Sequence, residues 1–503
     1  MRYLVTAEEM RKYDGNTIQR IGIPGMVLME RAAYETFLVL WEKGLVVKGE
    51  NALVLAGHGN NGGDGLALAR MLIDAGMEVD LKLVGDEAKA SEQWKEQRKI
   101  LKAYPVKFVS GDTSKIYHFV IDALFGVGLS RKIEGEYAKA IEMVNAMKGF
   151  KVAMDVPSGI HSDDGSELGI SFKADLTVTY GFVKRGLCLY PGCSSAGEVR
   201  LAPIGIREHS FFGETPTCFT MDESMEELLP KRKADGNKGT FGKALVIAGS
   251  KNMAGAAILC ARACYRLGAG MVKVLSQEEN RVILQESLPE ALLGMLDDKE
   301  ELWKSIAWSD VICIGPGLGR SVEAKDALET LLSMREFYEK PFVIDADGLN
   351  MIAAEAGLVE KLKGQAKSGR TIVLTPHPME LRRLYDALYA KEKELPAEEF
   401  KKNLEKAAKR IAEELDVIVV AKDARTFVVA KGEASYLNLS GNSGMGTAGS
   451  GDVLAGIITS FLAQGKGNPF LETCKAVRVH GLLGDEAAGK LGEHGVMAGD
   501  LIL

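Results

Sequence analysis

Short apolar runs alternate with longer amphipathic stretches through the first part of the chain. The apolar runs are rich in β-branched residues and lie at 52–56, 119–121, 152–154 and 177–179. Helix-like stretches separate several of them, at 65–75 and 137–147. Continuous apolar strands joined through helices are typical of a parallel sheet that is covered on both faces. This pattern predicts a parallel α/β domain.

The same alternation restarts after an irregular segment. Residues 206–230 contain two prolines, mixed polarity and no clear period. Beyond them, apolar runs recur at 244–248, 310–314, 342–344, 371–374 and 416–420. A second α/β domain is predicted there, and we place the boundary near residue 215, which gives domains 1–215 and 216–503. No internal repeat relates the two halves, so we expect two different α/β units.

Composition narrows the class of protein. The 503 residues exceed the size of one compact domain, and the net charge of −7 is spread along the chain without a basic block. This argues against nucleic acid or an anionic membrane as a partner. No apolar run approaches the roughly 20 residues that span a bilayer, so a cytoplasmic location is predicted. The seven cysteines are odd in number and include no CxxC pair, which argues against a disulfide framework or a zinc cage.

A glycine-rich loop at 57–65 follows the first predicted strand and leads into a helix-like stretch. Its glycines match the dinucleotide-binding fingerprint, in which backbone amides and a helix N-terminus converge where only glycine lets a phosphate approach. Two features depart from this fingerprint. The expected ribose-binding carboxylate should end the next strand, but Asp80 lies inside that strand. The loop also carries polar side chains, Asn60, Asn61 and Asp64, that a plain fingerprint lacks. A hydride-transferring Rossmann enzyme is therefore the second interpretation of this loop, and a glycine turn without a ligand is the remaining alternative.

Two further loops, 122–129 and 155–159, leave the carboxyl ends of strands in the same half. Such loops gather over one crevice of an open parallel sheet, so Asp122, Asp155 and Ser158 are predicted to share a site with Asn61. An aspartate at a strand end is often only a cap. Three such loops in one domain make capping alone a poor explanation.

These segments, with 4–10 and 22–31, resemble the epimerase that interconverts the two epimers of hydrated NADH and NADPH, over essentially the first 210 residues. The resemblance implies a Rossmann-like three-layer domain. It implies that the hydrate is bound by Gly59, Asn60, Asn61, Gly62, Gly63, Gly126, Val127, Gly128, Leu129, Ser130, Arg131, Lys132 and Asp155. It further implies a potassium ion held by Asn61, Asp122 and Ser158, with Asp155 as the catalytic residue at the nicotinamide end. His161 stands where that family commonly has a carboxylate.

A second glycine-rich loop, 442–452, precedes the apolar helix-like stretch 453–462. Glycine-permitted amides at a helix start bind an oxyanion, and Asp452 is placed to act on a hydroxyl beside them. An acidic residue in a first helical turn is also favourable on electrostatic grounds, so helix capping is the alternative for Asp452. Capping leaves the neighbouring glycines unexplained.

The Gly-Ser-Gly-Asp string at 449–452 resembles the anion hole of ribokinase-like kinases. Together with 238–242, 315–319, 345–350 and 375–378, it resembles the ADP- or ATP-dependent dehydratase of hydrated NAD(P)H, over about 225–503. The resemblance implies a ribokinase-like α/β domain that contacts the hydrate through Gly255, Gly317, His377 and Asp452. It implies an adenine nucleotide, with Mg²⁺, near Lys422, Asp423, Ala424, Arg425, Thr426 and Gly451. Departures from the common pattern are Gly348, Met379 and Asp423.

Both resemblances lead to one function, the repair of hydrated NADH and NADPH. The first domain is expected to equilibrate the epimers, and the second to dehydrate the S form at the expense of ADP or ATP. Asp452 is expected to take the proton of the hydrate hydroxyl as that hydroxyl attacks a phosphoryl group. A homo-oligomer is expected. The alternatives are a small-molecule kinase for the second half and, for the first, a dinucleotide-binding module without catalysis.

Overall fold

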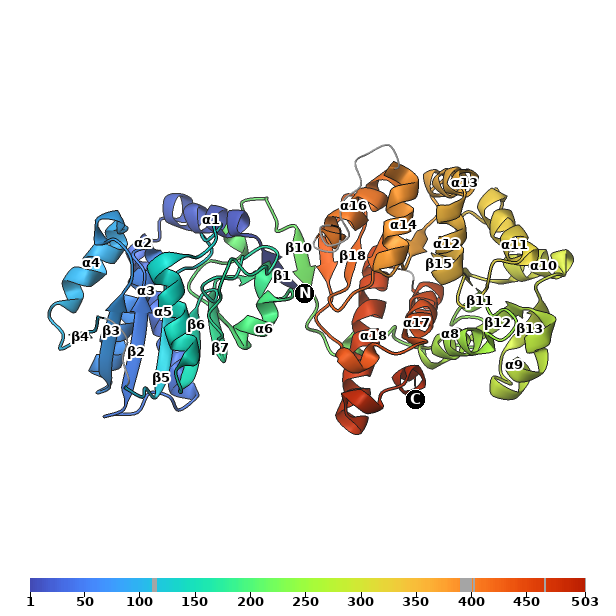
Figure 1. Cartoon of the computed structure of the whole chain (residues 1–503). Coiled ribbons are helices and arrows are strands. Elements are labelled where there is room, and N and C mark those ends of the chain that lie inside the picture. The colour runs from blue at the N-terminus through green and yellow to red at the C-terminus, as the bar shows by residue number, and fades with distance from the viewer. Residues whose placement is uncertain (111–114, 390–399, 401–402, 466, 503) are drawn as a thin grey trace. The chain divides into compact units, whose positions relative to one another are not determined.

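The chain forms two compact units in a computed structural model that describes residues 1–110, 115–389, 400, 403–465 and 467–502. One unit comprises Tyr3–Cys218, and the other comprises Phe219–Leu503 with Met1–Arg2 (Figure 1). Each unit is built on its own mainly parallel sheet, and each is described separately below.

The N-terminal unit contains a seven-stranded sheet in the order β4-β3-β2-β5-β6-β7-β9, in which all neighbours are parallel. Its strands are β2 (Asn51–Ala56), β3 (Glu78–Leu83), β4 (Lys107–Phe108), β5 (Phe119–Ala123), β6 (Phe150–Met154), β7 (Leu176–Tyr180) and β9 (Glu198–Ala202). The chain runs outward from β2 to β4 and then returns to place β5 on the other side of β2. The order therefore reverses between β2 and β5, and such a switch point leaves a crevice at the carboxyl ends of the strands.

Helices cover both faces of this sheet. They are α1 (Ala7–Asn16), α2 (Gly25–Glu42), α3 (Asn60–Asp74), α4 (Glu92–Leu101), α5 (Gly135–Ala146) and α6 (Gly192–Ala196). Alternate residues of β2 face opposite sides: Val54 packs in the core formed with α2, α3 and α4, and Leu53 packs in the core formed with α5. A short parallel pair, β1 (Arg2–Val5) and β8 (Val183–Lys184), lies outside the sheet.

Helix α3 begins earlier than the sequence pattern predicts. Residues 60–63 were expected in the loop, but they form the first helical turn. Glycine disfavours helix interiors, which hid this turn from the periodicity. The glycines are needed for packing, because a Cβ on Gly62 would collide with the carbonyl oxygen of Gly57, and one on Gly63 would lie 2.6 Å from Cε of Met29.

The C-terminal unit contains strands in the order β13-β12-β11-β14-β15-β16-β17-β18-β19. They are β11 (Lys243–Ile247), β12 (Met271–Ser276), β13 (Leu292–Met295), β14 (Val311–Ile314), β15 (Phe342–Ile344), β16 (Ile372–Leu374), β17 (Ile418–Ala421), β18 (Phe427–Val429) and β19 (Ser435–Leu437). The sheet is parallel from β13 to β17 and antiparallel beyond. Its order reverses between β11 and β14, which is a second switch point.

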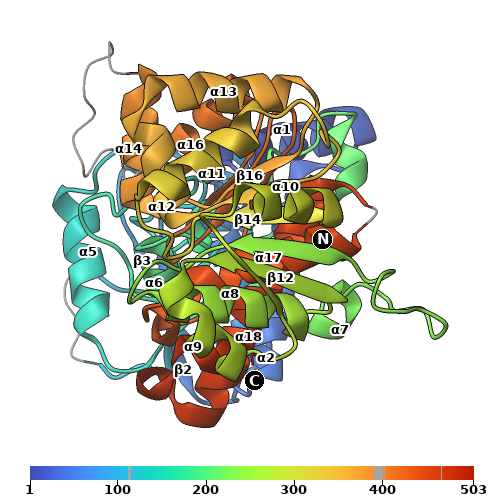
Figure 2. The ribbon, with the colours of Figure 1, turned by 90° about the vertical axis from the view of Figure 1, so that its right-hand side faces the viewer.

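Figure 2 shows α8, α9, α17 and α18 on one side of this sheet and the other long helices on the opposite side. The helices are α7 (Met225–Leu228), α8 (Ala254–Arg266), α9 (Arg281–Ser287), α10 (Lys299–Trp308), α11 (Val322–Ser333), α12 (Ala346–Ala354), α13 (Ala356–Lys367), α14 (Pro378–Tyr389), α16 (Leu404–Leu415), α17 (Ser450–Gln464) and α18 (Pro469–Leu491). The fully buried strands β14 and β17 explain the continuous apolar runs of the sequence. Within the described ranges, no helix is long and apolar enough to cross a membrane.

Candidate active sites

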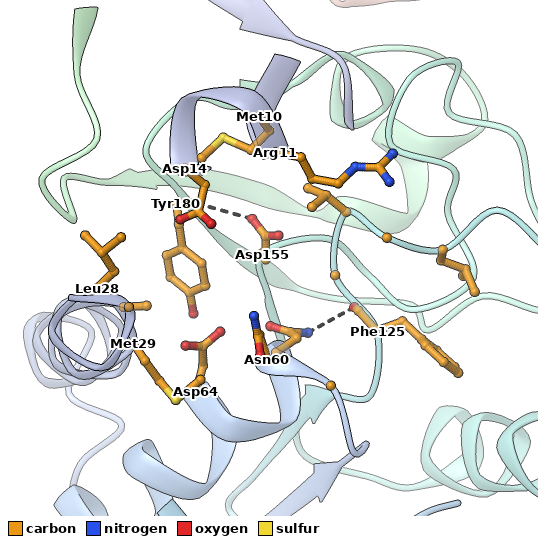
Figure 3. A pocket seen from close by; sticks show the side chains of 18 of the residues that line it. Met10, Arg11, Asp14, Leu28, Met29, Asn60, Asp64, Phe125, Asp155 and Tyr180 are labelled. Atoms are coloured by element: carbon orange, nitrogen blue, oxygen red, sulfur yellow. Dashed lines mark hydrogen bonds between the residues drawn. The ribbon is translucent and has the colours of Figure 1, made fainter. Parts of the chain in front are cut away.

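A cavity of about 620 Å³ lies at the carboxyl ends of the strands in the N-terminal unit, at the point where the strand order reverses (Figure 3). Of the predicted hydrate contacts, those that line it are Gly59, Asn60, Asn61, Gly126, Val127, Gly128, Leu129, Ser130, Arg131 and Asp155. Gly62 and Gly63 instead pack against protein atoms, and Lys132 is exposed beside Glu134. The structure therefore brings the two predicted loops together around one cavity.

The three residues predicted to hold potassium are Asp122 in β5, Ser158 in the loop after β6, and Asn61 in the first turn of α3, which lines this cavity. Ser158 donates from its hydroxyl and its backbone N–H to the two carboxylate oxygens of Asp122, each at 2.7 Å. Asn61 donates from Nδ2 to the carbonyl oxygens of Phe125 and Met154, at 3.0 and 3.1 Å. Its Oδ1 is buried and has no hydrogen-bond donor among the described residues. Burial raises the pKa of Asp122 to about 6, against the lowering effect of its hydrogen bonds.

Asp155 is held by a buried ion pair. Nζ of Lys184 lies 2.5 Å from Oδ1 of Asp155 and also donates to Thr179 and to the carbonyl of Tyr180. Lys184 is 1% exposed, so its charge is desolvated and committed to these partners. Asp155 has a φ of 68°, a strained conformation for a non-glycine residue. A Cβ on Gly126 would lie 3.1 Å from Oδ2 of Asp155, which explains why glycine occupies that position.

Sequence reasoning missed several polar residues of this cavity. Asp14, Asp64, Tyr180 and Lys184 all line it. Burial and then the nearby Asp155 carboxylate raise the pKa of Asp14 above its ordinary value and that of Asp64 well above it. Asp64 stands in the glycine-rich string that the sequence singled out, so a signal for it was present. Lys184 and Asp14 carry no local motif.

In the C-terminal unit, Asp452 is the third residue of α17, which begins after Gly449 in a left-handed conformation. Lys422, directly after β17, places Nζ 2.8 Å from Oδ1 of Asp345, and the Thr375 hydroxyl donates to the same oxygen at 2.6 Å. Burial and then the Asp345 carboxylate raise the pKa of Asp452 to about 7, while Lys422 lowers it. Asp452 is therefore partly ionised near neutral pH, as a general base requires.

Lys422 keeps its charge among several acids. Burial acts to lower the pKa of Lys422, but the carboxylates of Asp345 and Glu380 outweigh it and raise that pKa. A Cβ on Gly451 would lie 3.4 Å from Nζ of Lys422. The structure therefore brings two of the predicted nucleotide contacts, Lys422 and Gly451, side by side at the start of α17.

The predicted contacts between β17 and β18 form a tight loop. Asp423 accepts a hydrogen bond on Oδ1 from the N–H of Ala424 at 2.9 Å, and its carbonyl accepts from the Thr426 hydroxyl at 3.2 Å. Arg425 donates to the carbonyl of Leu439 at 3.3 Å. The Asp423 carboxylate is thus turned onto its own loop, where this hydrogen bond offsets part of its charge.

His377 is oriented by its neighbours at the start of α14. Nδ1 accepts a hydrogen bond from the N–H of Met379 at 3.1 Å, and Nε2 lies 3.3 Å from Oε1 of Glu380. Glu380 is buried and also accepts from the N–H of His377 at 2.9 Å. This arrangement favours the tautomer with its proton on Nε2. The imidazole itself is about half exposed.

The two remaining predicted substrate contacts are Gly317, which follows β14, and Gly255, at the start of α8. Gly317 has a φ of 53°, and its carbonyl accepts from the N–H of Ser250 at 2.6 Å. Gly255 is in the first turn of α8, and a Cβ there would meet open space. His480, which the sequence did not indicate, lies 3.1 Å from the Ser450 carbonyl, and burial lowers its pKa to about 4. A neutral His480 therefore supports the first turn of α17.

These features define a two-unit α/β protein with carboxyl groups gathered at the switch point of the first sheet and at the glycine-bounded start of α17 in the second unit. The family model of NAD(P)H-hydrate dehydratase matches residues 244–502, and that of the YjeF-related protein N-terminus matches residues 25–186. The bifunctional NAD(P)H-hydrate repair enzyme of Thermofilum pendens is 33% identical over 97% of this chain and 92% of its own length. That of Moorella thermoacetica is 35% identical, over 99% and 95% respectively. The chain belongs to the family of bifunctional NAD(P)H-hydrate repair enzymes.

The repair enzyme of Escherichia coli is 31% identical over 98% of this chain and 92% of its own length. Among solved structures, the ADP/ATP-dependent NAD(P)H-hydrate dehydratase of Bacillus subtilis, crystallised with ATP and Mg²⁺, is 28% identical. The match covers 55% of this chain and 93% of that one, with a TM-score of 0.45. The family match confirms the predicted fold class, a Rossmann-like unit followed by a ribokinase-like unit.

Proposed function

We propose that this protein repairs hydrated NADH and NADPH. The N-terminal unit equilibrates the two epimers, and the C-terminal unit dehydrates the S epimer with ADP or ATP and Mg²⁺. Family membership over nearly the whole chain supports the pairing of these activities. The observation that carries the proposal is Asp452, a carboxyl with a pKa of about 7 at a glycine-bounded helix N-terminus beside Lys422. A cytoplasmic homo-oligomer remains a prediction.

In the proposed dehydration, ionised Asp452 accepts the proton of the substrate hydroxyl while that oxygen attacks a phosphoryl group. The backbone N–H groups at 449–451 stabilise the transferred charge, because they lie at the positive end of α17. Phosphate is a better leaving group than hydroxide, so elimination then restores the reduced ring. His377, with its proton on Nε2, is proposed to orient the substrate, and Lys422 to contact the nucleotide.

Mg²⁺ is proposed to arrive with the nucleotide. Among the described residues, no group of three or more His, Cys, Asp or Glu side chains is arranged to hold a metal. Mg²⁺ is commonly held by substrate phosphates with only one or two carboxylates, so this arrangement fits the proposal. Its role is to neutralise charge on the phosphoryl groups.

Potassium fits the N-terminal loops. The buried, unpartnered Oδ1 of Asn61 is an oxygen of the type that hard cations prefer, and the Asp122 carboxyl supplies negative charge nearby. We propose that Asn61, Asp122 and Ser158 hold the ion. Such a charge balances Asp122 and fixes the loops that line the cavity.

Potassium is expected to raise the melting temperature of the whole protein. A ligand that binds only the folded state adds about 2.7 kcal/mol of stability when it is present at 100 times its dissociation constant. The measurement is thermal unfolding in KCl against choline chloride at equal ionic strength. Asp122→Asn should lose the difference, whereas Asp80→Asn, on β3, should keep it. Equal melting temperatures of the wild-type protein in KCl and in choline chloride would contradict the potassium site.

The two activities are expected to reside in separate fragments. Each unit has its own sheet and core, so a 1–215 fragment should epimerise and a 216–503 fragment should dehydrate one epimer. The measurement is chromatography of the epimers for the first and recovery of the reduced nicotinamide band for the second. Folded fragments with exchanged activities would reverse the assignment.

The direct test of the proposed function uses the full chain. Hydrated NADH is mixed with the protein, Mg²⁺ and ADP or ATP, and the near-ultraviolet absorption of reduced nicotinamide is followed. We expect the absorption to return fully, because epimerisation feeds the S epimer. No return with either nucleotide would overturn the proposal, and a stable phosphorylated product would instead indicate a kinase.

A further inference from the structure

The N-terminal cavity holds more acids than its buried lysine can neutralise. Asp14 from α1, Asp64 from α3 and Asp155 from the end of β6 all line it (Figure 3). Lys184 is buried and donates to Asp155, and to Thr179 and the Tyr180 carbonyl. Keeping a carboxylate ionised away from water is costly without a partner. Among the described residues, Asp155 has an ion-pair partner, whereas none is found for Asp14 or Asp64.

Asp64 is the unpaired acid closest to the predicted binding loop. It lies on α3 after the first turn that carries Asn60 and Asn61, and in Figure 3 it projects from that helix toward the cavity and the hydroxyl end of Tyr180. That hydroxyl is engaged with the Thr36 hydroxyl at 2.9 Å. Among the described residues, no hydrogen bond to the Asp64 carboxyl is found. Burial, then Asp155 and Asp14, raise its pKa well above the ordinary value, which favours the protonated form.

Interconversion of the two hydrate epimers requires a proton donor at the substrate hydroxyl. Reduced nicotinamide is an enamine, and water adds to an enamine with its oxygen on the carbon bonded to nitrogen. The two epimers therefore differ at a carbon that carries both a hydroxyl and the ring nitrogen. Loss of that hydroxyl leaves a planar C=N⁺ centre, which water attacks from either face. Hydroxide is a poor leaving group, so the departing oxygen needs an acid.

We propose, resting on the proposed epimerase function, that Asp64 is the general acid of epimerisation. Its proton passes to the substrate hydroxyl, the C–O bond breaks with both electrons leaving on oxygen, and the nitrogen lone pair forms the C=N⁺ bond. Water then adds to the opposite face, and the proton that it loses returns to the Asp64 carboxylate through the water molecule released in the first step. Asp155, which forms an ion pair with Lys184, stabilises the cationic ring. Water is released and consumed once, so the reaction balances without a co-reactant.

The surrounding charges support this division of roles. The titratable and charged groups that line the cavity with Asp64 are Arg11 and Asp14 on α1, Arg131 after β5, Asp155 after β6, Tyr180 on β7 and Lys184 on β8. Two acids whose surroundings keep one ionised and the other protonated form a usual acid and anion pair in active sites. Lys184 lies 2.5 Å from Asp155, so the Asp155 carboxyl is engaged with this lysine, whereas Asp64 has no such partner among the described residues.

The test uses the full chain, with each epimer of hydrated NADH and without nucleotide. Asp64→Asn imitates the protonated acid in shape and charge but has no acidic proton. We expect its kcat for epimerisation to fall at least about a hundredfold, with KM and the melting temperature close to wild type. Dehydration of the S epimer should be unchanged. The matched control is Asp74→Asn, an exposed acid at the end of the same helix, which should epimerise at the wild-type rate.

A second measurement does not depend on any variant. In H₂¹⁸O, the wild-type protein should incorporate one solvent oxygen in each epimerisation event. Epimerisation without incorporation overturns the proposed step, and so does Asp64→Asn activity within fivefold of wild type. A loss seen in Asp14→Asn instead of Asp64→Asn also overturns it. A wild-type protein that does not epimerise at all contradicts the proposed function itself, which separates the two failures.

Discussion

Asp452→Asn is expected to lower the rate of dehydration of the S epimer at least about a hundredfold and to leave the fold intact. The carboxyl has a pKa of about 7 because it is buried beside Asp345, so near neutral pH it accepts a proton that an amide cannot accept. General-base contributions are typically about 10²–10⁴-fold in rate. The measurement is recovery of reduced nicotinamide from the pure S epimer, with epimerisation as the internal control.

The alternative for Asp452 is helix capping, and stability separates the two roles. Among the described residues no capping hydrogen bond from Asp452 is found, and asparagine is itself a good capping residue. Because the folded-state pKa is raised, the stability that this carboxyl contributes is present at acid pH and is lost as pH rises through about 7. At pH 8 the melting temperature of Asp452→Asn should therefore equal or exceed that of the wild-type protein. If Asp452→Asn dehydrates the S epimer at a rate within a few-fold of wild type, Asp452 has a structural role only.

Local motifs made part of both sites predictable. The loop at 57–65 and the string at 449–452 are short, so sequence alone placed Asn61 after a strand and Asp452 at the start of a helix. The alternation of apolar runs predicted both sheets for a similar reason: a strand covered on both faces has no polar alternation to confuse it with a surface strand.

Pairings between distant residues were not predictable. Lys184 and Asp155 are 29 positions apart, and Lys422 and Asp345 are 77 apart, and only the strand order brings each pair together. The start of α3 was predicted too late because its first turn contains glycines that a helix normally avoids. Asp423 looked repulsive to a phosphate in the sequence, whereas its carboxylate accepts a hydrogen bond from the next amide.

The two units use the same electrostatic arrangement. In each, one lysine pairs with one buried aspartate, and a second carboxyl nearby has a raised pKa. Burial and then the paired aspartate raise the pKa of the second carboxyl, which holds a proton there more tightly. In the C-terminal unit, Lys422 also limits the rise, which leaves Asp452 near neutrality and suited to act as a base.

Lys422→Met is expected to reduce dehydration at pH 7 at least about a hundredfold, because it changes two things at once. The nucleotide loses a proposed contact, and Asp452 loses the cation that lowers its pKa. The pKa of Asp452 then rises above about 7, so less of the base is ionised at neutral pH and the rising limb of the pH–rate profile moves to higher pH. Removing an opposite charge shifts a carboxyl pKa by about 1–3 units.

Stability measurements separate these effects from misfolding. Lys422→Met leaves the buried Asp345 carboxylate unpaired, which typically costs about 3–5 kcal/mol, so the melting temperature should fall. Adding Asp345→Asn should restore the melting temperature, because it removes the unpaired charge. It also removes a carboxylate that raises the pKa of Asp452, so the pH–rate profile should move back, whereas the nucleotide contact stays lost. The matched control is Lys431→Met, an exposed lysine beyond β18, which should alter neither property. An unchanged pH–rate profile in Lys422→Met would show that this lysine does not tune Asp452.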